Sequence, residues 1–500
     1  MDGGVTGYTQ WLSSTSRIHL ADSTIRVLQS PRLAGAIRTY DLCEVVTNLA
    51  RYVRELSAVD VISQETMFDC LVRARECPFR RIEEMRRAAP GLVLRASLSA
   101  ATCLGASSAP RGVLTITAAE LVRSGIDIIR ICDPFNDLDR IVAAVTAASL
   151  SDAVVEGAVC LDGALHPNLP GAVSAAVAVA AGLERHGAHV LVIEDRIGAL
   201  RPVSAYALVR AIRREVSLPL CVRIVESSGY GLASLLSAIE AGAVGADTAL
   251  PTVAGPGHEL DGVVLTNAIH DTERRPETGL PGLVMMDEHI RALCSQLGGW
   301  RGFDRPPPDA PDRGITPAFL AEVTDRTIDS RTVSQDQALA ACEAAWRALG
   351  QPAWVSPARQ SLVELAVRMI ESGEAGGILL DRARVDDPQG LLDSVGSLRD
   401  GGFPESPTAE VDPRSRKELL EVLWGDRAKE LRRHQEQFGD LEMIPARACF
   451  LGIGPGDEFQ LVVDGEVRRI QVLAVDAESG EATVEIDGEQ VQIPALSGSP

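Results

Sequence analysis

Eight short runs rich in β-branched residues alternate with longer stretches of helical period from about residue 21 to residue 250, and this alternation constrains the fold most. The runs are STIRV (23–27), AVDVI (58–62), LVLRASL (92–98), IDIIRIC (126–132), VVEGAVC (154–160), HVLVIED (189–195), LPLCVRIV (218–225) and VGADTAL (244–250). The stretches between them repeat apolar residues with helical period, as in 40–56, 77–90, 171–187 and 202–216. Eight strand-and-helix units predict an α/β chain folded as a (β/α)8 TIM barrel, with its active site at the carboxyl ends of the strands.

The barrel pattern ends near residue 300, and we predict three regions. A barrel occupies 1–300, a linker and helix occupy 301–355, and the third region, 356–500, is helical first and β-rich at its end. The prolines and charges of 304–317 are typical of a linker. Helical patterns cover 334–350, 359–373 and 416–439, whereas 458–475 and 481–495 alternate with period two around Asp-Gly turns, which predicts a small antiparallel sheet.

Charge and lysine content exclude several functions. The chain carries 48 Lys and Arg against 69 Asp and Glu, a formal charge of −21, yet only Lys417 and Lys429 are lysines. Schiff-base, P-loop, carbamylated and biotinylated lysines are therefore excluded from residues 1–416. An acidic chain without a basic, aromatic-rich run is not expected to bind nucleic acid.

No stretch reaches the length of a membrane span, and the ten cysteines fall singly, so we expect a cytoplasmic protein with reduced thiols and no membrane contact.

Ordered motifs resemble the carboxyltransferase region of biotin-dependent enzymes, the family of pyruvate carboxylase, the oxaloacetate decarboxylase alpha subunit and the transcarboxylase subunit. DSTIRVLQSPRLAGAIRT (22–39) is similar to the family's opening DTTLRDxHQSLxATRxRT. ECPFRRIEEMR (76–86) and GIDIIRICDPFND (125–137) are similar to two further barrel motifs. GGFPES (401–406) and FGDLEMIPARACFLGIGPGDEF (438–459) resemble the conserved carboxylase domain that follows the family's barrel. The resemblance implies a TIM barrel, a carboxylase-like third region and a homodimer.

The resemblance also implies a divalent metal, held by an aspartate, a carbamylated lysine and two histidines. The corresponding positions here are Val27, Glu194, Arg223 and Val225, so every ligand is changed. None of the eight histidines lies at the upper end of the sixth or seventh strand, and none shows HxH or HxxxH spacing. We therefore predict a divergent member that has lost the metal site and has no cofactor.

The substrate side differs from the family as well. A family glutamine aligns with Ser30, a family arginine with Ser99, and the proton-shuttling threonine with Gly257, although Thr252 lies close enough to replace it. Polar residues that follow the predicted strands complete a candidate mouth for a small-molecule ligand; they are Asp133, Asn136, Asp195, Glu226, Ser228 and, on the eighth loop, His258. Asp133 could cap the loop that follows the fourth strand, or it could act in catalysis. A neutral or hydroxylated ligand, or one carboxylate matched to Arg223, fits this set of side chains better than a polyanion.

Glu194 and Arg223 are the strongest candidates for catalytic residues. They follow neighbouring strands, so they can meet as a charge-assisted pair on the barrel axis. The pair could be structural and fill a polar hole, or Arg223 could hold a carboxylate or enolate while Glu194 or Asp133 moves a proton.

Two functions follow from these interpretations. One is a metal-free, biotin-independent enzyme that performs acid/base C–C chemistry on a keto-acid or polyketide-like compound in specialised metabolism, of lyase or isomerase type. The reaction would be decarboxylation, enolisation, aldol chemistry or cyclisation. The other is an inactive homologue, a pseudoenzyme that scaffolds or partners a biotin-dependent carboxylase. Neither function includes metal-dependent carboxyl transfer.

Overall fold

The computed structural model covers the barrel and most of the elements that follow it. It describes residues 3–30, 37–53, 55–100, 113–161, 171–297, 305–307, 309–327, 333–349, 358–374, 376, 378–379, 415–438, 442–446, 448, 454–463, 466–476 and 481–494.

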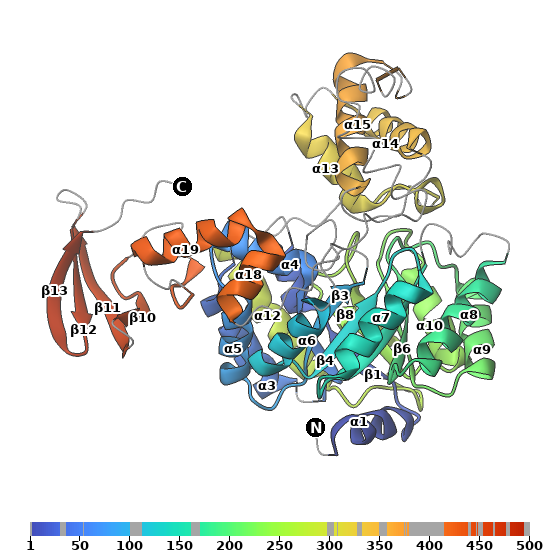
Figure 1. Ribbon diagram of the computed structural model, residues 1–500, viewed down its shortest axis with the longest axis horizontal. Coiled ribbons are helices and arrows are strands. Elements are labelled where there is room, and N and C mark those ends of the chain that lie inside the picture. Colours follow the sequence, from blue (N-terminus) through green and yellow to red (C-terminus); the bar gives the residue numbers. More distant parts are fainter. Residues whose placement is uncertain are drawn as a thin grey trace.

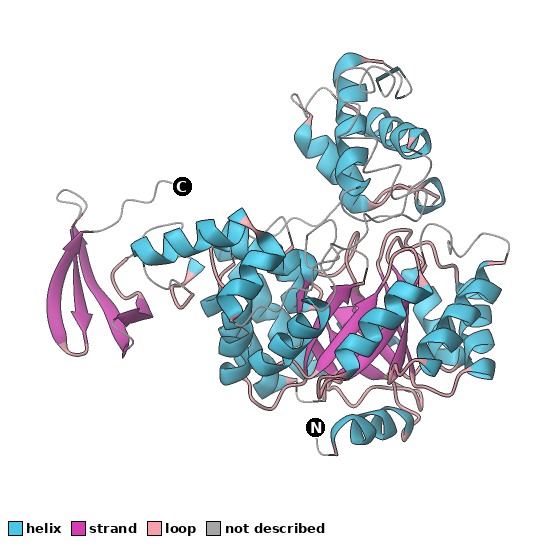
Figure 2. Ribbon diagram, in the orientation of Figure 1, coloured by secondary structure: helices cyan, strands magenta, loops and turns pink. Residues whose placement is uncertain are grey.

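Eight parallel strands close into a barrel, because β1 pairs with β8 as well as with β2 (Figures 1 and 2). The predicted (β/α)8 TIM barrel is therefore confirmed. A ninth strand of two residues, β9, adds to β8. The strands are β1 (His19–Asp22), β2 (Ala58–Ser63), β3 (Leu94–Ser99), β4 (Ile128–Cys132), β5 (Val154–Cys160), β6 (Val190–Asp195), β7 (Leu220–Ile224), β8 (Gly245–Ala249) and β9 (Leu260–Asp261).

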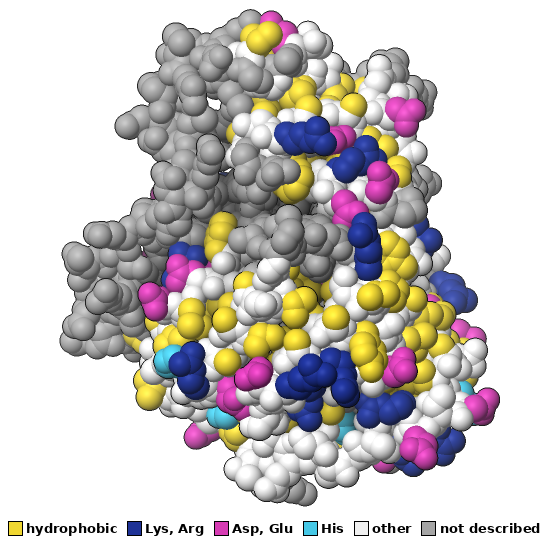
Figure 3. All heavy atoms as spheres, turned by 90° about the vertical axis from the view of Figure 1, so that its right-hand side faces the viewer, with side chains coloured by type: hydrophobic (Ala, Val, Ile, Leu, Met, Phe, Trp, Pro, Cys, Tyr) yellow, Lys and Arg dark blue, Asp and Glu magenta, His cyan; other side chains and the backbone are white. Residues whose placement is uncertain are grey.

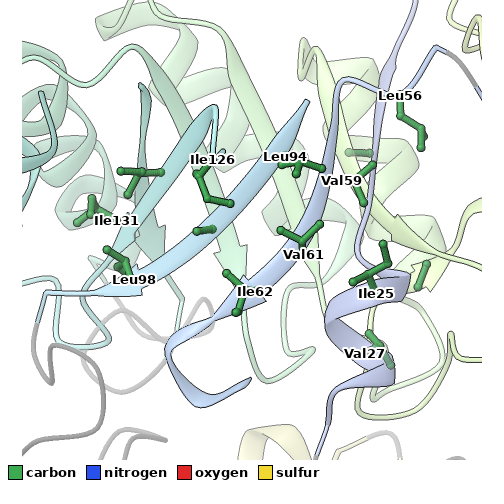
Figure 4. Close-up of a cluster of buried hydrophobic side chains, with 14 of the residues drawn as sticks. Ile25, Val27, Leu56, Val59, Val61, Ile62, Leu94, Leu98, Ile126 and Ile131 are labelled. Carbon is green, nitrogen blue, oxygen red and sulfur yellow. The ribbon is translucent and has the colours of Figure 1, made fainter. Parts of the chain in front are cut away.

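Helices surround the barrel and cover the outward-facing side chains of its strands (Figure 2). Val59, Val61, Leu94 and Leu98 belong to this buried layer (Figure 4). Burial of such side chains is the main source of the fold's stability. The helices are α3 (Thr39–Tyr52), α4 (Gln64–Asp69), a π-helix (Cys70–Ala74), α5 (Pro78–Ala88), α6 (Val113–Ser124), α7 (Leu138–Ser149), α8 (Ala172–Arg185), α9 (Pro202–Glu215), α10 (Gly231–Ala241), α11 (Gly262–Ala268) and α12 (Leu280–Gln296).

The first strand lies earlier than the sequence pattern indicates. Residues 23–27, expected to be extended, belong mainly to the helix α2 (Thr24–Leu28), and β1 ends at Asp22. The Asp22 carboxylate accepts hydrogen bonds from the backbone nitrogen and the hydroxyl of Thr24, which favours a turn at this point. Val27 is buried in the same apolar layer as Ile25 (Figure 4), and apolar burial rather than strand pairing explains the β-branched run.

The short helix α1 (Gly4–Ser13) covers the amino-terminal end of the barrel (Figure 1). The hydroxyl of Tyr8 donates to the carbonyl of Ser57, just before β2, at 3.3 Å, and Leu12 is buried among side chains of the barrel interior. The Trp11 ring lies 4.2 Å from the His19 ring. Since α1 covers this end, the mouth is the opposite end, where the strands finish.

A separate apolar core lies beyond the mouth (Figure 1). It is formed by α13 (Pro317–Arg326), α14 (Gln335–Ala348) and α15 (Ala358–Ser372) together with the 3-10 turn at Pro311–Arg313. Arg201, at the start of α9, joins this unit to the barrel through an ion pair with Asp312 at 2.6 Å. The division of the chain at residues 300 and 355 stays a prediction.

The third region begins with helices and ends in a sheet, as predicted. Both α18 (Arg416–Trp424) and α19 (Asp426–Phe438) are helical, and Gly425, with φ of 54°, separates them. Arg416 fastens α18 to the barrel through ion pairs with Glu83 and Glu120. The four strands β10 (Glu458–Val463), β11 (Glu466–Asp476), β12 (Glu481–Ile486) and β13 (Glu489–Pro494) form an antiparallel sheet. Among the described residues, no helix is long and apolar enough to cross a membrane.

Candidate active site

The barrel interior contains a buried network of charges. Arg95 of β3 and Arg130 of β4 both bind Asp247 of β8, with Arg95 Nη2 at 2.8 Å from Asp247 Oδ2. Arg130 Nε also lies 2.7 Å from Glu156 Oε2, and Asp60 of β2 lies 3.7 Å from Arg95. All five side chains are nearly inaccessible to solvent. Such a network is costly to break one member at a time, because each break leaves a buried charge unpaired.

Above this network, Glu194 and Arg223 meet as the sequence predicts. They are direct neighbours in the register of β6 and β7, and Arg223 Nη1 binds Glu194 Oε1. The same guanidinium also binds Glu259, with Nε and Nη2 both 2.7 Å from Oε1. Arg26 of α2 binds Glu259 as well, and its Nε lies 2.9 Å from Asp60 Oδ2. The predicted pair is thus part of a chain of ion pairs that continues into the barrel.

The guanidinium groups keep both carboxylates ionised. Burial alone would raise the pKa of Glu194, but Arg223, Arg196 and Arg130 lower it to about 2. Burial opposes ionisation of Glu259 in the same way, and Arg26 and Arg223 lower its pKa to about 2. Both carboxylates are therefore anionic at neutral pH and are weak bases.

Positive and negative charges alternate through the network. It contains Arg26, Arg95, Arg130 and Arg223 on one side and Asp60, Glu156, Glu194, Asp247 and Glu259 on the other. Arg196 adds a fifth guanidinium group near Glu194, so five positive charges face five negative charges. One acceptor of the network is unpartnered: Oε2 of Glu259 is buried and has no hydrogen-bond partner among the described residues.

Asp133 and Asn136 support the loops that follow β4 and β5. Asp133 accepts from the backbone nitrogen of Phe135 at 2.9 Å and from Arg140 Nε at 2.7 Å. Asn136, with φ of 51°, donates to the carbonyl of Cys160 and accepts from its backbone nitrogen. These contacts favour the loop-capping interpretation of Asp133 over a catalytic one.

Asp195 and Glu226 also bind backbone. The carboxylate of Asp195 accepts from four successive backbone nitrogens, those of residues 197–200, at 2.8 to 3.3 Å. Burial raises the pKa of Asp195 to about 6, although these hydrogen bonds oppose the shift. Glu226 accepts from the backbone nitrogen of Gly229 at 2.6 Å. Both residues shape the mouth, and their predicted contact with a ligand stays a prediction.

The remaining predicted ligand contacts are scattered around the mouth. The hydroxyl groups of Ser30 and Ser228 are buried and have no partner among the described residues. The backbone nitrogen of Ser99 donates to Gln64 Oε1 at 3.3 Å. His258 lies next to Glu259, and its carbonyl accepts from the backbone nitrogen of Glu226 at 2.7 Å.

Sequence reasoning missed Arg26 and Glu259 as well as the interior network. One signal was available: single charged residues interrupt otherwise apolar strands, as in LRASLS, IIRIC and VVEGAVC. A lone charge inside a buried strand needs a partner across the barrel. The sequence around Glu259 contains no such pattern. Glu259 lies beside Arg223 only because of the path that the chain takes between β8 and β9.

One group of described residues could hold a metal ion. The side-chain donor atoms of Cys132, Cys160 and Glu194 all lie within 4.8 Å of one another. The Cys160 thiol donates to Glu194 Oε2 at 3.6 Å, and the pKa of this thiol is raised by the Cys132 contact, burial and the Glu194 charge. A cation here would have to displace the thiol proton and lie close to the Arg223 guanidinium, which opposes its binding. The absence of a metal stays a prediction.

The fold is a (β/α)8 barrel with a network of ion pairs at its mouth, followed by a helical region and a small antiparallel sheet. No model of a known protein family matches the chain. Among solved structures, the carboxyl transferase domain of Rhizobium etli pyruvate carboxylase with pyruvate matches 99% of the chain and 90% of its own length, with a TM-score of 0.81 and 20% identity. The same domain with pyruvate and biocytin matches 98% of the chain, also with a TM-score of 0.81.

Sequence comparison also finds similarity to pyruvate carboxylases. Pyruvate carboxylase of Bacillus subtilis is 28% identical over 293 residues, which is 58% of this chain and 25% of that protein. Pyruvate carboxylase of Staphylococcus aureus is 21% identical over 528 residues, 96% of this chain and 46% of that protein. The chain is a homologue of pyruvate carboxylase with the fold of its carboxyltransferase domain. The chain matches 25% to 46% of the length of these two relatives.

Proposed function

We propose that this chain is a metal-free and biotin-independent enzyme that performs acid/base chemistry on a small neutral carbonyl compound at the barrel mouth. One observation carries the proposal: Arg223 is shared between Glu194 and Glu259, and Glu194 and Arg223 occupy two of the positions where the resemblance places metal ligands. A fixed pair of opposite charges at that place can stabilise a developing charge without a metal ion.

The contacts of Arg223 decide which substrate suits the site. Nε, Nη1 and Nη2 each contact a protein carboxylate, so only the second N–H of Nη1 and of Nη2 is left for a substrate. The Glu194 and Glu259 carboxylates that flank Arg223 would also repel an anionic substrate. Of the two classes that the sequence leaves open, a polyketide-like carbonyl compound is therefore favoured over a keto acid, and decarboxylation becomes the least favoured reaction.

Glu259 is the base in this proposal. Its Oε2 is the unpartnered acceptor, and its low pKa makes it a weak base that requires an acidic C–H bond. The carbon between two carbonyl groups supplies such a bond. The proton would pass from that carbon to Glu259 Oε2, and the enolate charge would be stabilised by the partly exposed guanidinium groups of Arg26 and Arg223. This step is shared by enolisation, aldol chemistry and cyclisation.

Deuterium exchange tests the proposal directly. The full-length protein is incubated in D2O with a panel of small 1,3-dicarbonyl compounds and keto acids, and NMR follows exchange at the α carbon. We expect catalysed exchange with the neutral 1,3-dicarbonyl compounds, lost in Glu259→Gln and kept in Arg326→Gln, which alters an exposed ion pair with Glu364. Exchange that is no faster than in buffer contradicts the enzyme, and catalysed exchange that survives Glu259→Gln contradicts Glu259 as its base.

A second function is a scaffold or partner of a biotin-dependent carboxylase. The observation in its favour is that the positions where the resemblance places metal ligands are Val27, Glu194, Arg223 and Val225, so every ligand of the family's metal is changed. This function predicts co-purification with carboxylase subunits and no exchange activity, so the same protein preparation distinguishes the two candidates.

A further inference from the structure

Arg81 of helix α5 is buried, although α5 lies on the outside of the barrel. Charged side chains of outer helices usually face solvent, and Figure 3 shows them on the outer surface of the side that carries α8 and α9. Arg81 is instead only 1% exposed. It belongs to the segment ECPFRRIEEMR (76–86), to which the proposed function gives no role. A buried guanidinium group loses its hydration, so it can stay in the interior only where protein groups replace the water.

The three nitrogens of the Arg81 guanidinium group each have a protein partner. Nη2 lies 2.6 Å from Glu76 Oε2, and Nε lies 3.1 Å from the Thr39 hydroxyl, which itself donates to Glu76 Oε2. Nη1 donates to Gln29 Oε1 at 2.7 Å. Glu76, Thr39 and Gln29 are as buried as Arg81. Two partners therefore fix the guanidinium group, and its third nitrogen holds the Gln29 amide.

Arg81 decides which way the Gln29 amide faces. Because Oε1 accepts from Arg81, the amide nitrogen Nε2 points the other way and donates to the carbonyl of Val61 at 2.6 Å and to that of Ile25 at 3.1 Å. Val61 belongs to β2. Ile25 belongs to α2, and its carbonyl is one of the last four of that helix, which lack a partner within the helix. The Gln29 amide therefore joins the end of α2 to β2.

Helix α2 carries Arg26, so the position of the helix decides where this guanidinium group lies. Arg26 binds Glu259 and Asp60, as described for the candidate site. A helix of five residues is too short to be stable alone. Ile25 and Val27 pack with the side chains of β2 (Figure 4), but apolar contact has no preferred direction. The directed hydrogen bonds of the Gln29 amide supply that direction.

We propose that Arg81 is a positioning residue of the candidate active site, which acts on Arg26 through Gln29 and α2. Arg81 holds the Gln29 amide, the amide holds the end of α2 on β2, and Arg26 thereby stays beside Glu259. The effect on catalysis rests on the proposed function. The position of α2 can be measured without it.

Gln29→Met tests the position of α2. This variant removes the amide, keeps the length of the side chain, and leaves the buried ion pair of Arg81 with Glu76 in place. Backbone amide hydrogen exchange of the full chain, followed by mass spectrometry, should show protection of residues 24–30 that falls by at least about 10-fold, with α5 still protected. Gln10→Met, at an exposed residue of α1, makes the same substitution and should leave α2 protected. Equal protection of α2 in Gln29→Met and wild type overturns the proposal.

A double-mutant cycle tests whether the effect on catalysis runs through Arg26. In the α-carbon exchange assay, Gln29→Met and Arg26→Gln should each lower kcat by about 10- to 100-fold with little change in KM, because Arg26 acts on the enolate, which forms only after proton transfer. The double variant should be no slower than Arg26→Gln alone. Losses that multiply in the double variant overturn the route through Arg26. A wild-type protein without α-carbon exchange contradicts the proposed function instead, and the protection of α2 then decides the role of Arg81 by itself.

Discussion

Glu259 receives both Nε and Nη2 of Arg223 on one oxygen, Oε1, at 2.7 Å. Its second oxygen, Oε2, is buried and has no partner among the described residues. The donors of Arg223 are thus directed at protein carboxylates, whereas Glu259 keeps an open acceptor. The two residues should therefore behave differently when they are replaced.

Arg223→Ala should lower the free energy of unfolding by about 3–5 kcal/mol, because it leaves the Glu194 and Glu259 carboxylates buried without their shared partner. Urea unfolding followed by circular dichroism measures this loss. Arg326→Ala breaks an ion pair at the surface and should cost less than about 1 kcal/mol. Equal losses in the two variants would contradict a structural role for Arg223.

Glu259→Gln should reduce catalysis far more than stability. Glutamine preserves the shape of the side chain and one carbonyl acceptor, so we expect a loss of about 1–3 kcal/mol in the free energy of unfolding. The proposed base is removed, so catalysed deuterium exchange should fall by at least about 100-fold. Rates are compared at a temperature where both proteins are fully folded. A variant that unfolds like wild type and still exchanges at the wild-type rate would assign the base to another residue.

The pH dependence of stability should identify Glu194 and Glu259 as ionised partners. Their folded pKa of about 2 lies below the ordinary value of 4.5, so their contribution is complete above about pH 4.5 and is lost as pH falls toward 2. Asp195, with a pKa raised to about 6, acts with the opposite sign and costs stability as pH rises through that value. We expect the double variant Glu194→Gln/Glu259→Gln to have a shallower acid limb in urea unfolding. An unchanged acid limb would mean that neither carboxylate is ionised in the folded protein.

The sequence predicts most of the barrel because buried strands leave a strong local signal. Seven of the eight predicted runs coincide with strands to within two residues at each end. The run at 23–27 fails because α2 buries Ile25 and Val27 against the barrel, and a buried helix and a buried strand have similar compositions over five residues.

The candidate site is predictable only where its residues lie on adjacent strands. Glu194 and Arg223 were found because β6 and β7 are neighbours in any barrel of this order. Glu259 comes from the segment after β8, and Arg26 comes from a helix mistaken for a strand, so neither position could be placed beside Arg223. The four backbone nitrogens that donate to the Asp195 carboxylate could not be predicted either, because only the loop conformation brings them to it.

Gly198→Ala should disturb the mouth through the loop that follows β6. Gly198 has φ of 73°, and an added Cβ would lie 2.5 Å from the carbonyl oxygen of Val225 and from Cβ of Ser227. Gly171, with φ of 83°, has no atom of the described residues within 4 Å of an added Cβ, so Gly171→Ala serves as the control for the backbone strain, about 1–2 kcal/mol. Gly198→Ala should cost more than this control in thermal unfolding and should also slow exchange. Equal costs would show that the contact between the two loops is unimportant.

Elemental analysis of the purified protein tests the prediction that the protein binds no metal ion. Among the described residues, one cluster of side chains could hold such an ion. Cys132, Cys160 and Glu194 converge, but Arg223 competes for Glu194 and the Cys160 thiol has a raised pKa. We therefore expect less than stoichiometric zinc, manganese or iron, and exchange activity that survives dialysis against a chelator. The double variant Cys132→Ser/Cys160→Ser should leave activity within a few-fold of wild type, since serine keeps a hydroxyl donor for Glu194. Stoichiometric zinc that disappears in this variant together with activity would replace the metal-free site with a thiolate metal centre.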